Sequence, residues 1–327
     1  MPSGEVVLVT GAAGFVGSHL VQHLVRTNNS KPVIAWRRPD TGHNQRPVTP
    51  PWSFGDSSTV QWNNVDLLDR EGVTREIAEV RPSQIYHLAG AANVRDSWRH
   101  SALSLETNVR GTQFLLEAIS SARLSTRVLI PGSALVYQPS TDAIAEDHPI
   151  GPVSPYGLSK LAQEMLGGKC ADSELAILFP RSFTHLGPGQ NPSYAVSSFA
   201  SQIAKIETNE TPPVIRVGSL EALRDLTDVR DTVDAYRALM ARGVSGRPYN
   251  VCSGHAHRMS DVLEALLSQT DVDVAVHIDQ KRLRPKDNDL LLGDPSRINA
   301  EIGWYAKTEL EETLRDTLNY WRDVVRL

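Results

Sequence analysis

Cysteine is scarce in this sequence. Its 327 residues include two cysteines, Cys170 and Cys252, which lie far apart and lack the spacing of a metal site. A disulfide framework is therefore excluded, and we expect two buried thiols in a reducing compartment and no metal centre.

A long hydrophobic run and an excess of either charge are also missing. No stretch of about 18 apolar residues occurs, and the segment before Thr10 is too short and, with Glu5, too acidic for a signal peptide. With 33 Lys and Arg against 38 Asp and Glu, the net charge of −5 gives no electrostatic reason to bind nucleic acid. We expect a cytoplasmic globular protein that contacts neither a membrane nor nucleic acid.

The first 180 residues do contain a regular alternation of short apolar runs and helical patterns. Val6–Val9 suits a strand buried on both faces, while Phe15–Arg26 places apolar residues at helical spacing. The predicted strands are 6–9, 33–36, 60–66, 84–88, 127–131 and 175–179, and the predicted helices are 15–26, 69–79, 107–123 and 155–167. This order predicts an α/β fold with a doubly wound parallel sheet.

Beyond residue 180 the alternation weakens. Helical patterns recur at 194–207, 231–242, 259–270 and 309–325. The apolar run Tyr249–Cys252 is predicted to rejoin the main sheet as a further strand. Residues 38–59, rich in Pro, Thr, Asn and Gly, are predicted to form a long polar loop.

Three glycines follow the first predicted strand. The segment Thr10-Gly-Ala-Ala-Gly-Phe-Val-Gly17 places Gly11, Gly14 and Gly17 three residues apart, around Phe15 and Val16. The first glycine permits a tight turn, the second lets the backbone approach a pyrophosphate, and the third lets the helix pack closely on the sheet. The N–H groups at the helix start then face the phosphates of a dinucleotide.

The position of this turn suggests which part of the chain binds the cofactor and which part binds the substrate. We expect a dinucleotide-binding domain at 1–180, completed by a returning segment at about 225–254. The smaller C-terminal lobe, at about 181–224 and 255–327, is expected to bind the substrate.

The end of the second strand favours one form of the cofactor. An NAD site has a carboxylate there that accepts from the ribose 2′-hydroxyl, but this chain has Arg37 and Arg38. Two guanidinium groups suit a 2′-phosphate, so NADP(H) is preferred and NAD(H) remains possible.

Two further strand ends are expected to border the cofactor. Asp66, followed by Leu67, either accepts a hydrogen bond from the adenine or caps the next helix. Small residues after the fourth strand leave room for the cofactor beside Leu88 and Ala89, although they also suit close helix–sheet packing.

A tyrosine and a lysine four residues apart open the helix at 155–167. Tyr156 and Lys160 therefore lie on one helical face, one turn apart. A neighbouring ammonium lowers the pKa of a phenol and makes proton exchange with a substrate oxygen feasible. Ser133, just past the fifth strand, is placed to donate to the developing oxyanion. We predict Ser133, Tyr156 and Lys160 as the catalytic residues. Ser133 is then also a substrate contact, and Tyr156 and Lys160 also border the cofactor, where the lysine can hold the nicotinamide ribose.

These motifs, in this order, resemble the extended short-chain dehydrogenase/reductase superfamily. The resemblance continues with Arg181-Ser-Phe-Thr-His-Leu-Gly-Pro-Gly-Gln190, which is similar to the RPFNHxGPGQ segment of GDP-6-deoxy-4-keto-D-lyxo-mannose reductases. Segments 217–231 and 249–254, together with Leu283-Arg-Pro285 and Gly303-Trp304, extend it over nearly the full length. Thr184 and Ser219 stand where that family has asparagine.

The resemblance implies a set of substrate contacts. Arg224 and Arg284 are expected to face the substrate diphosphate, with the segment that holds Arg181 and His185 near the nucleotide. Arginine suits that task, although each arginine is also a candidate for a structural ion pair. His185 is equally suited to pinning its loop. A homodimer, formed by helices 102–120 and 155–167 in a four-helix bundle, is expected by analogy.

The implied activity is reduction of the C4 ketone of GDP-4-keto-6-deoxy-D-mannose to GDP-D-rhamnose with NAD(P)H. Related sugar 4,6-dehydratases have an acid pair beside the strand-end Ser or Thr, where this chain has Ala134 and Leu135, so water elimination is disfavoured. A nucleotide-sugar 4-epimerase with tightly bound NAD is the nearest alternative. A catalytically silent NADP-binding sensor or scaffold on the same fold is the second.

Overall fold

The structure is a computed structural model that describes residues 5–27, 31–39, 60–282 and 289–326. In chain order its elements are β1 (Val7–Thr10), α1 (Phe15–Thr27), β2 (Val33–Arg37), β3 (Val60–Asn64), α2 (Arg70–Val80), β4 (Gln84–His87), α3 (Val94–Arg99), α4 (Ser101–Leu105), a π-helical segment (Glu106–Arg110), α5 (Gly111–Ser121), β5 (Thr126–Leu129), β6 (Gly132–Ser133), a 3₁₀ segment (Ala134–Val136), α6 (Pro155–Cys170), β7 (Leu175–Ser182), β8 (Thr184–Leu186), α7 (Ala195–Glu207), β9 (Val214–Val217), β10 (Leu223–Asp228), α8 (Val229–Arg242), β11 (Pro248–Val251), β12 (Ala256–Arg258), α9 (Met259–Leu267), β13 (Ala275–Ile278), a 3₁₀ segment (Gln280–Arg282), β14 (Leu290–Leu291), α10 (Ser296–Ile302) and α11 (Leu310–Arg326). Of the predicted loop at 38–59, residues 40–59 lie outside the described part of the chain.

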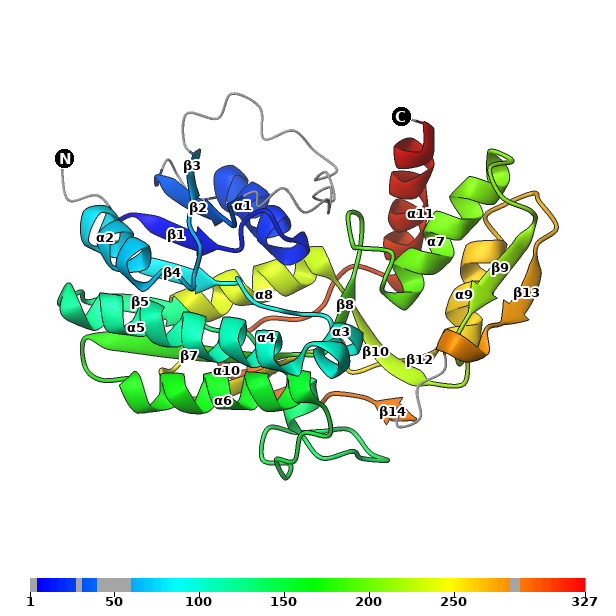
Figure 1. Ribbon diagram of the computed structural model, residues 1–327. Helices are drawn as coiled ribbons and strands as arrows, with labels where there is room; N and C mark the ends of the chain where they lie inside the picture. The colour runs from blue at the N-terminus through cyan, green and yellow to red at the C-terminus, as the bar shows by residue number, and fades with distance from the viewer. Residues whose placement is uncertain (1–4, 28–30, 40–59, 283–288, 327) are drawn as a thin grey trace.

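The main sheet has the strand order β11-β7-β5-β4-β1-β2-β3, with the short β6 also paired to β7 (Figure 1). Its pairings are all parallel. The chain runs outward from β1 to β3, then crosses back to β4 on the other side of β1, which creates a switch point between β1 and β4. The predicted doubly wound sheet is confirmed, and the apolar run at 249–252 joins its far edge as β11.

Both faces of this sheet are buried. Val7 and Val9 of β1 pack with Leu20 of α1, in a core that α8 and α10 complete. Leu8 points to the opposite face and packs in a second core, which contains Ile77 of α2 and side chains of α5. Because both faces need apolar side chains, the strands read as continuous apolar runs without alternation.

A smaller lobe lies beside the carboxyl ends of the main strands. β10 pairs with β8, β12 and β14, while β9 pairs with β13. The helices α7, α9 and α11 pack around these strands at the right of Figure 1, on a core of its own. Since β10 belongs to this lobe, the chain returns to the main sheet with α8, a few residues after the predicted 225. In the described ranges, no helix is long and apolar enough to cross a membrane.

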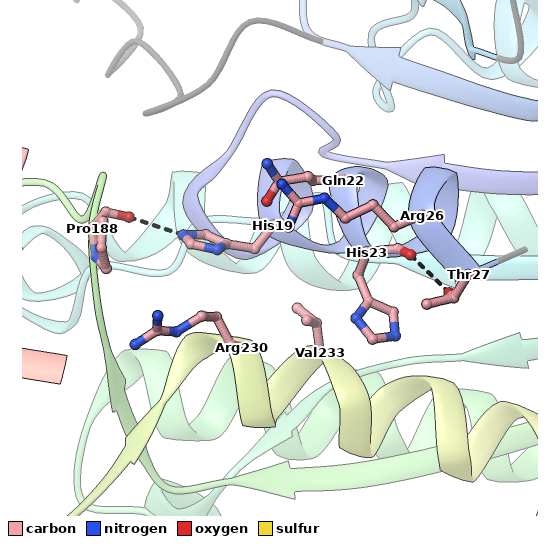
Figure 2. A pocket seen from close by; sticks show the side chains of 8 residues that line it. All are labelled: His19, Gln22, His23, Arg26, Thr27, Pro188, Arg230 and Val233. Atoms are coloured by element: carbon pink, nitrogen blue, oxygen red, sulfur yellow. Dashed lines mark hydrogen bonds between the residues drawn. The ribbon is translucent and has the colours of Figure 1, made fainter. Parts of the chain in front are cut away.

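The helix α1 is held to the C-terminal half of the chain by a histidine. His19 Nε2 lies 2.9 Å from the carbonyl oxygen of Pro188, in the loop after β8. Burial lowers the pKa of His19 to about 4, so the ring is neutral and donates this hydrogen bond. The contact borders a cavity of about 370 Å³ between α1 and α8, which His23, Arg26 and Arg230 also line (Figure 2).

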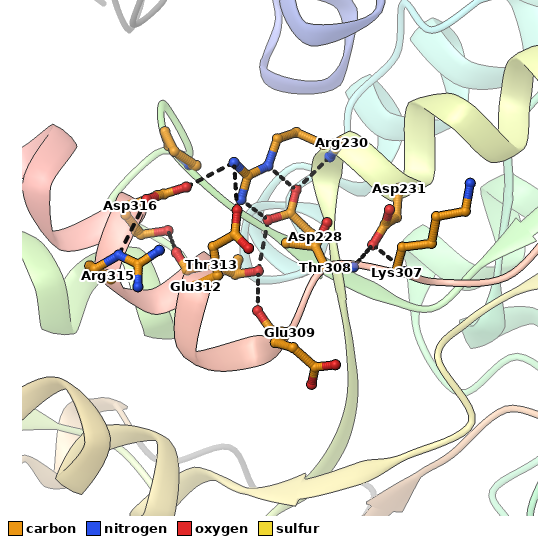
Figure 3. A network of polar contacts seen from close by, with 12 residues as sticks. Asp228, Arg230, Asp231, Lys307, Thr308, Glu309, Glu312, Thr313, Arg315 and Asp316 are labelled. Atoms are coloured by element: carbon orange, nitrogen blue, oxygen red, sulfur yellow. Dashed lines mark hydrogen bonds and ion pairs between the residues drawn. The ribbon is translucent and has the colours of Figure 1, made fainter.

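A network of charged groups joins α8 to the C-terminal helix. The Asp228 side chain is fully buried and caps α8 by accepting from the backbone N–H of Arg230 at 2.6 Å. It also accepts from the Arg230 guanidinium at 2.7 and 2.9 Å and from Thr313 Oγ1 of α11 at 2.7 Å. Arg230 reaches Asp316 of α11 at 2.8 Å (Figure 3). The lobe is therefore fixed to the main sheet by a buried carboxylate.

Asp228→Asn is expected to lower the free energy of unfolding by about 2 kcal/mol, because hydrogen bonds to a charged group contribute about 1.5–3 kcal/mol. Chemical denaturation followed by circular dichroism measures this loss. The matched control is Asp234→Asn on the same helix, whose 3.3 Å ion pair with Arg237 is solvent-exposed. That change is expected to cost less than about 0.5 kcal/mol. Equal losses in the two variants would contradict a special role for Asp228.

Candidate active site

The glycine turn lies at the switch point of the sheet, between β1 and α1. Gly11 has a φ of +65°, and a Cβ built there would lie 2.6 Å from the backbone nitrogen of Ala89 after β4. A Cβ on Gly17 would lie 2.1 Å from the carbonyl oxygen of Gly11. These two positions therefore require glycine, one for its conformation and one for the close approach of α1 to the turn.

The start of α1 is suited to an anion. Ala13 and Gly14 are exposed there, and the first turn of the helix contains no acidic residue. The partial positive charge of the helix N-terminus therefore faces solvent without a carboxylate from its own first turn. The turn fits the pyrophosphate of a dinucleotide, with Phe15 and Val16 half-buried beside it.

Arg37 and Arg38 are both exposed where β2 ends. Arg37 Nε donates to Asn64 Oδ1 at 2.8 Å, and its guanidinium lies 5.9 Å from the ring centre of Trp62. Both partners come from β3, the neighbouring edge strand. Arg37 is therefore held at the sheet edge, in a place where a guanidinium suits a phosphate.

The other predicted cofactor residues lie at adjacent strand ends. Asp66 accepts from the backbone of Leu68 at 3.0 Å, whereas the cap of α2 is Asp69, which accepts from Gly72 at 3.0 Å. The alternative that Asp66 caps this helix is therefore wrong. The Leu67 side chain is buried in the core beneath α2 and α5. Only the backbone of Leu67 is therefore placed to contact a cofactor at this strand end. Leu88 and Ala89 are half-buried beside Gly11.

The catalytic helix α6 begins at a well-formed cap. Ser154 Oγ accepts from Gly157 N at 3.0 Å, and Pro155 occupies the first turn, where a missing N–H has no cost. The backbone N–H of Tyr156 donates to Ser97 Oγ at 3.2 Å. The Tyr156 hydroxyl forms a hydrogen bond with Ser133. The structure thus brings Tyr156 and Ser133 together, with Lys160 one turn along the same helix.

Gly157 sets the distance between α6 and the serine. A Cβ at this position would lie 2.3 Å from the carbonyl oxygen of Leu135 and 3.0 Å from the Pro152 ring. Leu135 belongs to the 3₁₀ segment that follows Ser133, and the Ser133 Oγ caps this segment by accepting from Leu135 N at 3.2 Å. The missing side chain therefore lets Tyr156 and Ser133 meet. The motif alone does not reveal this role.

The pKa of Tyr156 departs from the sequence-based expectation. Burial raises it above the ordinary tyrosine value, and Tyr194 adds to the rise while the hydrogen bond with Ser133 opposes it. The expected lowering of this pKa is therefore not found as the net shift, because removing solvent from the phenolate outweighs the effects that favour it. At neutral pH the phenol therefore holds its proton, as a proton donor must.

Lys160 is bonded to a side chain of its own helix. Its ammonium donates to Gln163 Oε1. Burial lowers the pKa of Lys160 to about 8, and the charge of Glu164 opposes that shift. The amine is therefore charged in most molecules at neutral pH and becomes neutral as the pH rises through about 8.

Arg181 does not face a substrate site. Its guanidinium is buried and donates to Glu164 at 2.5 and 3.0 Å, to Tyr137 Oη at 2.9 Å and to the carbonyl oxygen of Glu146 at 3.2 Å. Its position on β7 directs the side chain into the interior between α6 and the 3₁₀ segment. Arg181 is therefore a structural ion-pair partner of Glu164 in this structure, in place of the substrate contact that the resemblance implied.

His185 lies against the glycine turn. Its ring stacks on Phe15 with centroids 6.1 Å apart, and its Nδ1 lies 3.2 Å from the carbonyl oxygen of Phe183. Burial lowers the pKa of His185, so the ring is neutral. The histidine pins its own loop and also borders the first turn of α1.

Arg224 is half-buried on β10 of the smaller lobe. Its Nη1 donates to the carbonyl oxygen of Leu223 at 2.9 Å and to that of Asp289 at 3.4 Å. The next residue, Asp225, is buried and accepts from Ser253, Gly254 and Gly293, which fixes β10 to the neighbouring loops. Arg284, the other predicted diphosphate contact, lies outside the described residues.

Two residues near Tyr156 were missed by sequence reasoning. Asn108, in the π-helical segment, donates to Ser159 Oγ at 2.8 Å and to Ala91 O at 3.1 Å, joining α6 to the loop after β4. The Tyr194 hydroxyl, from the smaller lobe, donates to Ala92 O of that loop at 3.3 Å. Neither belongs to a motif recognised in the sequence, although a π-helical turn often marks a functional site.

Known proteins resemble this chain over nearly its whole length. The GDP-mannose 4,6 dehydratase family matches residues 8–317. The GDP-6-deoxy-D-mannose reductase of Pseudomonas aeruginosa is 30% identical over 324 residues, which cover 98% of each chain.

Solved structures share the fold. The structure of RMD from Pseudomonas aeruginosa complexed with NADPH has a TM-score of 0.82 at 27% identity, covering 98% of this chain and 99% of that one. The Thermus thermophilus UDP-glucose 4-epimerase complexed with NAD has a TM-score of 0.82 at 28% identity, covering 97% and 99%. The resemblance predicted from the sequence is confirmed.

Proposed function

The chain belongs to the GDP-mannose 4,6 dehydratase family, and from that premise we propose that it reduces the C4 ketone of GDP-4-keto-6-deoxy-D-mannose to GDP-D-rhamnose with NADPH. Its relatives are nicotinamide-dependent enzymes that act on nucleotide sugars. The observation that carries the proposal is Tyr156, which is half-buried, holds its proton at neutral pH and is hydrogen-bonded to Ser133.

Reduction at C4 needs a hydride and a proton. A dinucleotide whose pyrophosphate is held by the glycine turn would supply the hydride from its dihydronicotinamide. Tyr156 holds the proton and gives it to the C4 oxygen as negative charge develops there. Ser133 donates a hydrogen bond to the same oxygen. The Lys160 ammonium then stabilises the phenolate that remains.

The lobes divide these tasks. We assign the main sheet with α8 and β11 to cofactor binding, and the lobe around β10 to the GDP-sugar. Arg224 is the described arginine that we place toward the diphosphate, with His185 beside the cofactor turn. We assign Asp66 to the adenine, because its other expected role, capping α2, is filled by Asp69.

A 4-epimerase is the second candidate, because the NAD-bound epimerase of Thermus thermophilus has the same fold over nearly its whole length. Two exposed arginines after β2 favour the reductase, since they suit the 2′-phosphate of a cofactor that is consumed. A dehydratase is disfavoured because Ala134 and Leu135 carry no acid. A silent sensor would have no need for the Ser133–Tyr156 pair.

The substrate assignment is tested with a panel of ketosugars linked to GDP, UDP and dTDP. We expect NADPH oxidation with the GDP-linked 4-keto-6-deoxymannose and at least about tenfold lower kcat/KM with the other nucleotides, since each tenfold loss corresponds to about 1.4 kcal/mol. Equal rates with all three nucleotides would contradict the GDP assignment while leaving the reduction intact.

Cofactor preference is tested by removing the two arginines. Replacing Arg37 and Arg38 with alanine is expected to weaken NADPH binding about tenfold or more, since a charge-assisted hydrogen bond contributes about 1.5–3 kcal/mol. NADH binding should change little. Fluorescence titration with both cofactors measures this, and Arg26→Ala at the far end of α1 is the control. Equal losses for NADPH and NADH would contradict a 2′-phosphate site.

We also propose a homodimer. Large apolar side chains are exposed on α3, α4 and α6, which pack together on one face of the molecule: Trp98, Leu103, Leu105, Leu158 and Met165. Leu158 and Met165 are 50% and 63% exposed and lie two helical turns apart on α6. Large apolar side chains exposed on three helices that contact one another fit an interface between two copies of the chain.

The double variant Leu158→Glu, Met165→Glu is expected to convert a dimer to a monomer, because four carboxylates would have to be buried at a two-fold interface. Light scattering after size-exclusion chromatography measures the mass. Val276→Glu on β13, where the valine is 45% exposed, is the control and should remain dimeric. A monomeric unmodified protein would contradict the dimer.

A further inference from the structure

A buried chain of hydrogen bonds connects the catalytic lysine to the glycine turn. Gln163, one turn past Lys160, accepts from its ammonium and donates through Nε2 to Thr112 Oγ1 at 2.7 Å. Thr112, on α5, lies 2.9 Å from His87 Nε2, and His87 Nδ1 lies 2.9 Å from Thr10 Oγ1. Each of Gln163, Thr112, His87 and Thr10 is at most 1% exposed.

In this series of hydrogen bonds, the donor and the acceptor of each bond can be assigned without conflict. Thr112 Oγ1 donates to Asn108 O at 2.6 Å, so toward Gln163 and His87 it is an acceptor. His87 must then donate through Nε2 and accept at Nδ1 from the Thr10 hydroxyl. Thr10 Oγ1 in turn accepts from Ala89 N at 3.1 Å, beside the place where Gly11 needs glycine. Every polar atom of the chain is satisfied.

His87 is a fixed link in this chain and carries no proton along it. Burial lowers its pKa to about 3, and the charge of Lys160 lowers it further, so the imidazole is neutral at every physiological pH. The amide of Gln163 likewise exchanges no proton at neutral pH. The chain therefore holds groups in place, and what it holds at its outer end is the amine of Lys160.

We propose that Gln163 is a positioning residue for Lys160, held by Thr112 and His87 so that the place of the catalytic amine is tied to the glycine turn. The inference rests on the proposed catalytic role of Lys160. It adds that the helical backbone of α6 does not by itself fix the lysine side chain. The amide of Gln163 fixes it, and the place of that amide depends on the Thr112 hydroxyl of α5.

The hydrogen bond also bears on the charge of the lysine. An acceptor for the ammonium favours the charged form, whereas burial disfavours it. The titratable groups that interact with Lys160 in the described chain are Glu164 on α6 and His87 at the end of β4, and Tyr156 lies one turn before the lysine on the same helix. Glu164 is shared with Arg181, and His87 and Tyr156 are neutral at neutral pH. Gln163 is thus the neutral acceptor in direct contact with the ammonium.

The test is the titration of Lys160 in the protein without sugar or cofactor. Acetylation by a small excess of acetic anhydride at a series of pH values, quantified by mass spectrometry of the Lys160 peptide, gives the midpoint at which the amine loses its proton. Gln163→Met removes the acceptor and should move the midpoint down by about one pH unit, since a hydrogen bond to a charged group contributes about 1.5–3 kcal/mol. Gln163→Glu keeps the length of the side chain and should move it up.

Two variants of Thr112, the hydrogen-bond partner of Gln163, distinguish a positioning role from a packing role. Thr112→Val keeps the shape but leaves the Gln163 amide without its acceptor, so the midpoint should move down, and Thr112→Ser should restore it. Gln113→Met, at an exposed glutamine next to Thr112, is the control and should leave the midpoint unchanged. NADPH affinity, measured by fluorescence, should fall about tenfold in Gln163→Met and recover in Thr112→Ser relative to Thr112→Val.

A midpoint that is the same in Gln163→Met, Gln163→Glu and the unmodified protein would overturn the proposal. So would a Thr112→Val variant that loses thermal stability with no change in the midpoint, because that result is packing alone. Because the titration uses no sugar, an error in the proposed substrate leaves it unaffected.

Discussion

Tyr156→Phe is expected to lower turnover by about a hundredfold or more, because a general acid in the transition state contributes about 10²–10⁴ in rate. The change removes one oxygen atom and leaves the ring in its packing. In the structure this hydroxyl keeps its proton at neutral pH and is hydrogen-bonded to Ser133. Steady-state kinetics with NADPH and ketosugar measures the loss.

Cofactor binding is expected to be unaffected by this change. NADPH affinity of Tyr156→Phe is expected to stay within about twofold of the unmodified protein, since a single uncharged contact contributes little to binding of so many polar groups. Tyr320→Phe, at a buried tyrosine of the smaller lobe, provides the matched control and should keep full turnover. A Tyr156→Phe enzyme with unchanged kcat would remove the phenol from the reaction.

Gly157→Ala is the second large effect, and it acts on geometry rather than on a reacting group. The added methyl would lie 2.3 Å from the Leu135 carbonyl oxygen, so α6 must move away from the segment that carries Ser133. A displacement of about 1 Å in a catalytic constellation costs about a hundredfold in rate. We expect a loss of that size in kcat.

Gly168→Ala is the matched control for this change. Gly168 lies on the same helix, and a Cβ there would meet no atom within 4 Å. Alanine should stabilise the helix by about 0.5–1 kcal/mol and leave kcat unchanged. If Gly157→Ala and Gly168→Ala had equal activity, the close approach at Gly157 would not determine the Tyr156–Ser133 geometry.

Much of the fold follows from local patterns. Continuous apolar strands such as β1, separated by amphipathic helices, predict the parallel sheet because a strand covered on both faces can be filled in few other ways. The glycine turn can be predicted from the sequence because the backbone conformation at Gly11 and the close approach of α1 at Gly17 both require glycine. Tyr156 and Lys160 are readable because four residues of helix place them on one face.

The remainder depends on contacts between distant segments. Arg181 belongs to a motif that resembles a substrate segment, yet Glu164 and Tyr137, from other elements, turn it inward. The Tyr156 pKa depends on how far the folded protein excludes solvent from the phenol, and the spacing of residues in a motif does not indicate this. Gln163 looks like an ordinary helical glutamine until α5 brings Thr112 against it.

The most direct test uses NADPH that carries deuterium in the transferable position, mixed with GDP-4-keto-6-deoxy-D-mannose and the unmodified protein. Mass spectrometry and NMR of the sugar product locate the label. We expect one deuterium at C4 of GDP-D-rhamnose and an equimolar amount of NADP⁺. An isomerised sugar without label, with the cofactor still reduced, would contradict the account.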